Sequence, residues 1–269
     1  MNALRAAALA LGLALVVASA AEAHRAWLKP QTTVLSGEQA WVTLDAGISN
    51  TLFLADHAAM RLEGLTIVNP DGSTSAPQNP STGKYRSTFD AALPKPGTYR
   101  VAVVTEGVMA SYKVGDETKR WRGQAAELAT AIPAGATEVR VTQSQRRIET
   151  FVSLGAPNAT ALKPTGKGLE LEFLTHPNDL AAGEAAQFRL LMDGKPAPDV
   201  EVEVVLGDTR YRAAGVERKV KSGADGLVRV TWPEAGMYWI EATVRDGRAT
   251  IPNAQRAASY MATLEVQPN

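Results

Sequence analysis

Residues 201–204 read Glu-Val-Glu-Val, and residues 227–230 read Leu-Val-Arg-Val. In both stretches apolar and charged side chains alternate with a period of two, which is typical of a β-strand with one buried and one solvated face. Similar short runs recur along the chain and are separated by Gly, Pro, Asn and Asp. Turns such as residues 69–72, Asn-Pro-Asp-Gly, place Gly where the backbone needs a positive φ. The pattern predicts an all-β fold built from sandwiches.

Two parts of the chain resemble each other weakly. The motif Pro-x-x-Gly-x-Tyr occurs at residues 94–99 and again at 233–238, and each copy follows a strand that opens on Gly-Glu. In such sandwiches this Tyr fills the end of the core, and its hydroxyl bonds to the backbone. We therefore expect two tandem immunoglobulin-like β-sandwich domains, at residues 24–160 and 161–269, with the boundary in the Pro- and Gly-rich stretch 155–168.

One stretch, from Asp116 to Ile132, departs from the β pattern. The helix-forming residues after Gly123 predict a short helix over the first sandwich. Residues 119–122 form the basic cluster Lys-Arg-Trp-Arg. This cluster is either a solvated connection with Trp121 folded onto the sandwich, or a site for an anion or an aromatic ligand.

The first 23 residues predict export. One positive charge at Arg5 precedes an apolar run from Ala6 to about Ala18, and residues 21–23 end the segment with Ala-Glu-Ala. The run is shorter than the roughly 20 residues that a membrane span needs. We therefore expect residues 1–23 to be a signal peptide, the location to be periplasmic, and the mature chain to begin at His24 without a membrane span.

Charge balance and the absence of Cys exclude several classes of function. The 269 residues include 28 Lys and Arg against 28 Asp and Glu, so the chain lacks the net positive charge typical of nucleic-acid-binding proteins. The lack of Cys excludes disulfides, Fe–S clusters, thiolate zinc sites and thiol nucleophiles. Nucleophile-elbow, zincin, phosphate-loop and dinucleotide motifs are also missing from the sequence. The sequence therefore predicts a protein that is not an enzyme.

Pairs of carboxylates that could act as acid and base occur on strands. Glu170 with Glu172 and Glu201 with Glu203 are each two residues apart. A period of two places both members of a pair on the same face of the strand, and we expect that face to be solvated. These pairs are therefore interpreted as surface charges that favour solubility.

The candidate metal ligands are the three His residues, His24, His57 and His176. As the first residue of the mature chain, His24 would offer its α-amine and its ring Nδ1 to one divalent metal ion. A second imidazole would complete a three-nitrogen site that suits Cu(II), and Ni or Co more loosely. His57, flanked by Asp56, and His176 are the available second imidazoles.

Each His also has an interpretation that involves no metal. His24 can be a frayed residue beside the cleavage site. His57 can be a loop residue hydrogen-bonded to Asp56. His176 precedes Pro177, and the Asn and Asp that follow it are typical of a turn. Nothing in the sequence brings the three imidazoles together.

An ordered set of motifs resembles a known family over nearly the whole mature chain. The motifs are His24-Arg25-x-Trp27-Leu28, Leu35-Ser36-Gly37-Glu38, Ala55-Asp56-His57, Pro70-Asp71-Gly72, Pro96-Gly97-Thr98-Tyr99, Leu174-Thr175-His176-Pro177-Asn178-Asp179-Leu180, Asp193-Gly194-Lys195-Pro196 and Asp225-Gly226. They resemble a widespread bacterial family of periplasmic proteins with a domain of unknown function, labelled as nickel-uptake or NikM-like transport components. The resemblance implies a secreted β-sandwich protein that handles nickel or cobalt.

A weaker resemblance concerns copper. The opening His and the sandwich shape are similar to small periplasmic copper carriers of the CopC kind. This chain departs from them because it has adjacent Asp56 and His57 in place of an Asp-x-His pair. In an extended segment, adjacent residues point to opposite sides.

Together, these observations predict a periplasmic, non-enzymatic accessory in the uptake or homeostasis of nickel, cobalt or copper. Its expected partner is a membrane transporter component or another periplasmic protein. The alternative is a metal-free protein-interaction or carbohydrate-binding module. Oxidative cleavage of polysaccharides, as in copper oxygenases that begin with His, is the competing enzymatic interpretation. It requires a flat aromatic surface and an axial Tyr or Phe, which the sequence does not identify.

Overall fold

The computed structural model describes residues 24–207 and 217–269, so the predicted signal peptide at 1–23 lies outside the described residues. The described residues form three sheets and very little helix. In these two ranges no helix is long and apolar enough to cross a membrane. The helical segments are single short turns: η1 (Ala125–Glu127), α1 (Leu128–Ala131) and η2 (Thr160–Leu162).

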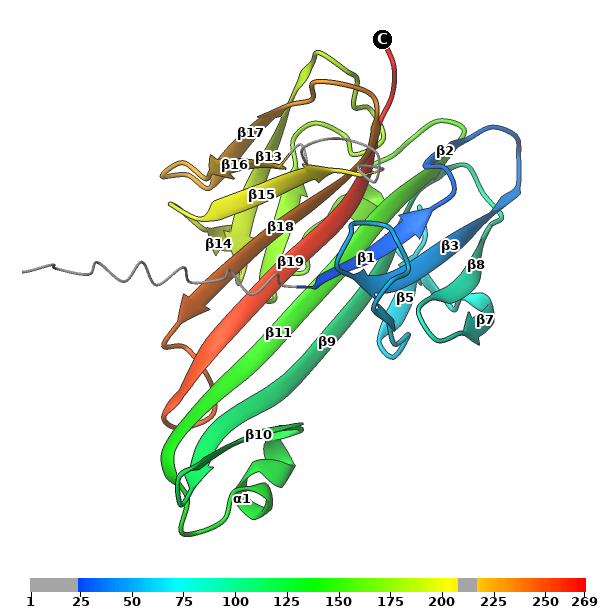
Figure 1. Ribbon diagram of the computed structural model, residues 1–269. Coiled ribbons are helices and arrows are strands. Elements are labelled where there is room, and N and C mark those ends of the chain that lie inside the picture. Colours follow the sequence, from blue (N-terminus) through cyan, green and yellow to red (C-terminus); the bar gives the residue numbers. More distant parts are fainter. Residues whose placement is uncertain (1–23, 208–216) are drawn as a thin grey trace, which may run out of the picture.

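The largest sheet has ten strands and runs diagonally through the molecule (Figure 1). We call it the central sheet. Its order is β16 (Glu217–Lys221), β15 (Glu201–Leu206), β18 (Gly236–Asp246), β19 (Ala254–Val266), β11 (Thr137–Leu154), β9 (Gly97–Val114), β5 (Leu65–Val68) and β6 (Thr74–Ser75). Two further strands are attached to it, β10 (Glu117–Gly123) on β9 and β2 (Val34–Leu35) on β11.

Two smaller sheets flank the central sheet. The N-terminal sheet consists of β1 (Arg25–Pro30), β3 (Ala40–Ser49), β8 (Ser87–Leu93) and β7 (Gln78–Thr82), with β4 (Ala58–Ala59) on β3. The C-terminal sheet consists of β12 (Leu169–Phe173), β13 (Ala185–Met192) and β14 (Lys195–Pro196), with β17 (Leu227–Thr231) on β13.

The two smaller sheets cover opposite faces of the central sheet. Along β18, Tyr238 and Ile240 belong to the core under the C-terminal sheet, whereas Trp239 between them belongs to the core under the N-terminal sheet. Successive side chains of a strand point to opposite faces, so each core lies on its own face. The predicted fold class, all-β with immunoglobulin-like sandwiches, is confirmed. The two sandwiches share the central sheet.

This shared sheet crosses the predicted domain boundary. Strand β11 pairs in parallel with β19, from Val141 opposite Ala254 to Thr150 opposite Thr263. The separation into domains at 24–160 and 161–269 stays a prediction. The structure adds that the two segments are joined edge to edge by backbone hydrogen bonds.

The two Pro-x-x-Gly-x-Tyr motifs form the predicted Tyr contacts. The Tyr99 hydroxyl donates to the backbone oxygen of Lys95 at 2.7 Å, and the Tyr238 hydroxyl donates to that of Glu234 at 2.8 Å. Both rings are buried. Burial raises the pKa of Tyr99, which keeps its hydroxyl protonated as a donor. The internal repeat therefore reflects the same contact in both sandwiches, a buried Tyr whose hydroxyl donates to a backbone oxygen four residues earlier.

Strands β9 and β11 continue past the N-terminal sheet and carry β10 and α1 at their far end (Figure 1). We call residues 107–144 the extension. Its even-numbered β9 residues, Val108, Ala110 and Tyr112, are buried, whereas the odd-numbered residues between them are partly exposed. Residues 117–123 form β10, and the short helix predicted after Gly123 is α1 (Leu128–Ala131), which lies at the far end of the extension and not over the first sandwich (Figure 1). One face of the extension is therefore covered and the other is open.

Candidate functional site

The side chains of His24 and His57 lie face to face at the protein surface. Their ring centroids are 3.7 Å apart, and the ring planes are inclined by 21°. Both side chains are exposed. Two of the three imidazoles predicted from the sequence therefore meet at one point. We call them the histidine pair.

Strand β3 brings the histidine pair together. His24 directly precedes β1, and Arg25 of β1 lies opposite Ser49 of β3. His57 directly precedes β4, and Ala58 of β4 lies opposite Ile48 of β3. The two His residues are therefore both placed beside the C-terminal end of β3. The register of the β1–β3 and β4–β3 pairings sets the distance between their rings.

The start of β1 is firmly anchored. Trp27 is buried, and its Nε1 donates to the Ser49 hydroxyl at 2.8 Å. A guanidinium nitrogen of Arg25 lies 2.7 Å from a carboxylate oxygen of Glu203 and 3.3 Å from one of Glu217. These contacts restrict the backbone immediately after His24, so the position from which the His24 side chain extends is fixed.

Asp56 supports the loop that carries His57. Its two carboxylate oxygens accept hydrogen bonds from the backbone N–H groups of Asn50 at 2.8 Å and Thr51 at 3.1 Å. Burial alone would raise the pKa of Asp56, but these N–H donors outweigh burial and lower it. Asp56 is therefore an ionised carboxylate that closes the loop between β3 and β4, and its role as a metal ligand stays a prediction.

The structure places His176 elsewhere, between the start of β9 and the loop after β12. Its Nδ1 accepts the backbone N–H of Asn178 at 3.1 Å, so this nitrogen carries no proton. Its Nε2 lies 3.0 Å from the Thr98 hydroxyl and donates to the backbone oxygen of Asn158 at 3.3 Å. Burial lowers the pKa of His176, which favours this neutral form. Both ring nitrogens of His176 therefore already have partners within the protein. The ring contact at the surface involves only His24 and His57.

The described residues contain no group of three His, Asp or Glu side chains close enough to hold a metal ion. A third donor at the histidine pair would therefore be the α-amine of a chain that begins at His24. In stacked rings the nitrogen lone pairs lie in nearly parallel planes, so the rings must rotate before both can ligate one ion. Exposed side chains make such rotations easily, and metal–nitrogen distances near 2 Å allow about 4 Å between the two nitrogens.

A separate cluster of charges is buried beneath the C-terminal sheet. Arg147 lies 3.0 Å from Glu149 and 3.3 Å from Glu170, and the Tyr260 hydroxyl donates to Glu149 at 3.1 Å. The expectation that Glu170 lies on a solvated face is wrong, because its side chain is buried. Its carboxylate accepts N–H groups of the loop at residues 165–167, which replace water as partners. This cluster is a structural element closed to ligands.

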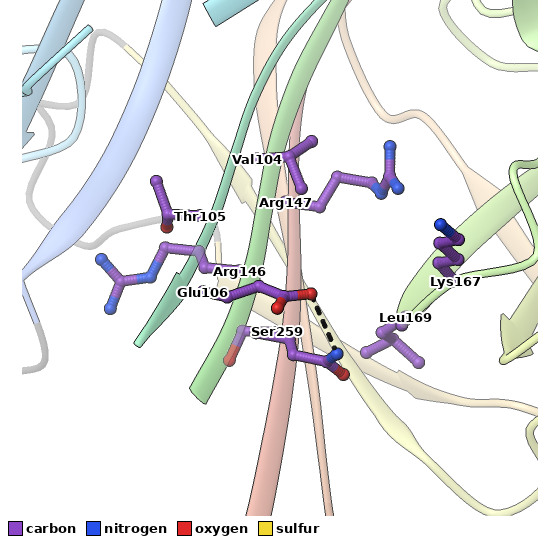
Figure 2. Close-up of a pocket in the computed structure, with 10 residues that line it drawn as sticks. Val104, Thr105, Glu106, Arg146, Arg147, Lys167, Leu169 and Ser259 are labelled. Atoms are coloured by element: carbon purple, nitrogen blue, oxygen red, sulfur yellow. Dashed lines mark hydrogen bonds between the residues drawn. The ribbon is translucent and has the colours of Figure 1, made fainter. Parts of the chain in front are cut away.

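Figure 2 shows a small hollow beside this cluster, where Arg146 and Arg147 leave β11 in opposite directions. The hollow measures about 20 Å³. That volume holds about one water molecule, so the hollow cannot take an organic ligand. The histidine pair is therefore the stronger candidate for function.

Comparison with known proteins assigns the chain to a family. Residues 21–246 match the family described as Domain of unknown function (DUF4198). The chain belongs to this family. The DUF4198 match covers both members of the histidine pair and crosses the predicted domain boundary. No curated protein matches the chain.

Solved structures resemble this DUF4198 protein only distantly. The D0-D1 domain of intimin is 12% identical and aligns over 89% of this chain and 96% of that chain, with a TM-score of 0.22. A segment of two fibronectin type-III domains from chicken tenascin is 10% identical over 90% of this chain and 99% of that chain, with a TM-score of 0.23. These similarities carry no functional argument.

Proposed function

We propose that the mature protein binds one divalent transition-metal ion, Ni, Co or Cu, through the histidine pair and the α-amine of His24. It would act outside the cytoplasm as a non-enzymatic accessory in metal uptake or homeostasis. The single observation that carries the proposal is the 3.7 Å approach of the His24 and His57 rings.

The donor set fits these metals. Neutral imidazole and amine nitrogens suit Cu(II), Ni(II) and Co(II), whereas Mg and Ca prefer oxygen ligands. Both imidazoles are exposed, so an ion can reach them without a conformational change in the sheets. Arg25, the cation next to His24, is paired with the carboxylates of Glu203 and Glu217, which reduces its repulsion of a metal ion.

The proposed location and partner rest on the sequence. Residues 1–23 have the pattern of a signal peptide, and removing them creates the α-amine that the site needs. The resemblance to nickel-uptake components suggests that the ion is cargo, passed to or from a membrane transporter component. An exposed site with few ligands suits release of an ion better than a closed four-ligand site.

The test is calorimetric titration of the mature chain with Cu(II), Ni(II) and Co(II). We expect sub-micromolar binding of at least one ion and at least about a tenfold loss of affinity in His24→Ala and in His57→Ala, because each removes one of three nitrogen ligands. A variant with one additional residue before His24 should bind weakly, since its amine no longer shares a chelate ring with the imidazole.

The matched control is His176→Gln, which removes the third imidazole without touching the pair. Its metal affinity should equal that of the unaltered chain. If none of the three ions binds with sub-micromolar affinity, the proposal fails, and a metal-free interaction or carbohydrate-binding module becomes the better description. Mass spectrometry of the exported protein gives its true first residue.

A further inference from the structure

The open face of the extension carries an unusual concentration of arginines. Opposite residues of neighbouring strands share a face, and Arg120 of β10 and Arg140 of β11 both lie opposite Ser111 of β9. One row further along, Arg122 and Thr142 both lie opposite Met109. Because residues two apart on a strand also share a face, the two rows form one surface.

These residues line a groove of about 450 Å³ across β10, β9 and β11. Arg120, Arg122 and Arg140 are all exposed. Arg120 and Arg140 are separated by two strand spacings, or about 10 Å. Their long side chains can therefore reach a common group held above Ser111.

None of the three guanidiniums forms an ion pair within residues 24–207 and 217–269. The nearby carboxylates of Glu117 and Glu138 are bound instead to Lys119 at 3.3 Å and Lys113 at 2.6 Å. Arg122 has only a weak acceptor, the Met109 sulfur at 3.4 Å. The groove thus holds three positive charges that the described part of the chain does not compensate.

A fourth arginine extends this positive field. Arg146 follows Arg140, Thr142 and Ser144 at intervals of two along β11, and so lies on the same face. The pKa of Arg146 is lowered by desolvation and then by the positive charge of Arg122, and the carboxylate of Glu241 offsets only part of this shift. Neighbouring cations that destabilise each other's charge are relieved by a bound anion.

We propose that this groove binds the phosphate group of an organic phosphate ester. Guanidinium forks pair with phosphate oxygens in a bidentate manner, and a phosphate carries up to two negative charges. The hydroxyls of Ser111 and Thr142 supply neutral donors between the arginines. Met109, on the same face as the arginines, supplies apolar lining for the organic part of the ligand. The site is independent of the histidine pair.

The same chemistry is available from a soluble phosphate ester and from a phospholipid headgroup. Two assays on the mature chain distinguish these sources. The first is calorimetric titration with glycerol 3-phosphate, and the second is co-sedimentation with vesicles of phosphatidylglycerol against vesicles of phosphatidylcholine. A vesicle-specific result assigns the site to a lipid headgroup, and a response to glycerol 3-phosphate alone assigns it to a soluble ester.

The double variant Arg120→Gln/Arg140→Gln should weaken binding by about tenfold or more, because it removes two charge-assisted hydrogen-bonding partners. Arg120→Lys, which keeps the charge but loses the fork, should weaken it less. Binding should also decrease between about 50 and 200 mM NaCl. The control is Arg229→Gln, an exposed arginine on β17, far from the groove in the fold.

Two results would overturn the proposal. One is the absence of saturable binding in both assays at low salt. The other is an equal loss of binding in Arg229→Gln and in the double variant, which would indicate attraction by the whole surface. Circular dichroism of each variant verifies that the fold is intact, and the exposed positions make that the expected result.

Discussion

The three His side chains have the same chemistry but occupy different environments. His24 and His57 are exposed, stacked on one another and open to a metal ion. His176 is half-buried, and both of its nitrogens are engaged with protein atoms. Sequence reasoning identified all three as candidates, because residue type alone indicates ligand capacity. Which ring nitrogens stay free also depends on partners such as the Thr98 hydroxyl, which is 78 residues away from His176 in the sequence.

His176 leads to a prediction about stability and pH. Its pKa in the folded chain lies below the ordinary value of 6.5, chiefly through burial, so the unfolded chain takes up a proton first as the pH falls. The neutral ring therefore stabilises the folded state above about pH 6.5, and this stabilisation is lost progressively at lower pH. In urea denaturation, His176→Gln should be less stable than the unaltered chain by about 1 kcal/mol at pH 8.

The difference in unfolding free energy between the unaltered chain and His176→Gln should be smaller at pH 5 than at pH 8. Titration of carboxylates affects both proteins alike and cancels in the comparison. An unchanged difference in unfolding free energy between pH 8 and pH 5 would show that the protonation of His176 is not linked to folding.

At the scale of the element, the contact between β1 and β3 determines where the site lies. Trp27 of β1 lies directly opposite Gly47 of β3, and a Cβ atom at residue 47 would be 2.5 Å from Cζ2 of the Trp27 ring. Both residues are buried. The absence of a side chain at Gly47 therefore leaves room for the Trp27 ring beside β3, from where its Nε1 reaches the Ser49 hydroxyl.

Gly47→Ala should destabilise the protein by forcing the Trp27 ring to move. Overpacking of this kind costs about 1–3 kcal/mol. In a chain of this size the melting temperature should then decrease by about 2–12 °C. The matched control is Gly135→Ala, where an added Cβ has no neighbour within 4 Å. Equal melting temperatures for the two variants, measured by calorimetry, would contradict the packing argument.

Strand β10 shows a limit of reading elements from sequence. An interior strand such as β15, which pairs with both β16 and β18, can be recognised by its alternating apolar and charged residues. β10 pairs only with β9, and most of its residues are exposed. Charged residues are common on such edge strands, which removes the period-two signal. The sequence of residues 117–123 therefore predicts a connection, and the groove across β10, β9 and β11 depends on a strand that the period-two pattern does not indicate.

At the scale of the whole molecule, the central sheet connects the two sandwiches. Local alternation of apolar and charged residues predicts individual strands, and the repeated Pro-x-x-Gly-x-Tyr motif predicts the two Tyr contacts. The structure contains both. The parallel pairing of β11 with β19 unites residues far apart in the sequence, and no local pattern encodes it. The contact from Trp239 to the backbone oxygen of Ala26 at 2.9 Å is equally long-range. The meeting of His24 and His57 likewise depends on strand register, which the sequence does not state.

The shared sheet predicts a single unfolding transition. Separation of the two sandwiches would expose Trp239 and Met261, which complete the core under the N-terminal sheet from strands of the C-terminal segment. Differential scanning calorimetry of the mature chain should therefore give one peak whose calorimetric and van't Hoff enthalpies agree. Two resolved peaks would mean that the sandwiches unfold independently despite the shared sheet.

The position of β19 in the central sheet also affects the order in which the strands can pair during folding. It is the last strand among residues 24–207 and 217–269, yet it lies inside the central sheet between β18 and β11. While the chain emerges from its N-terminus, the side of β11 that β19 will occupy has no partner. Contacts of such large sequence separation form slowly, because the intervening loop must close first. Both sandwiches therefore stay incomplete until residues 254–266 have been synthesised, because this strand contributes side chains to both cores.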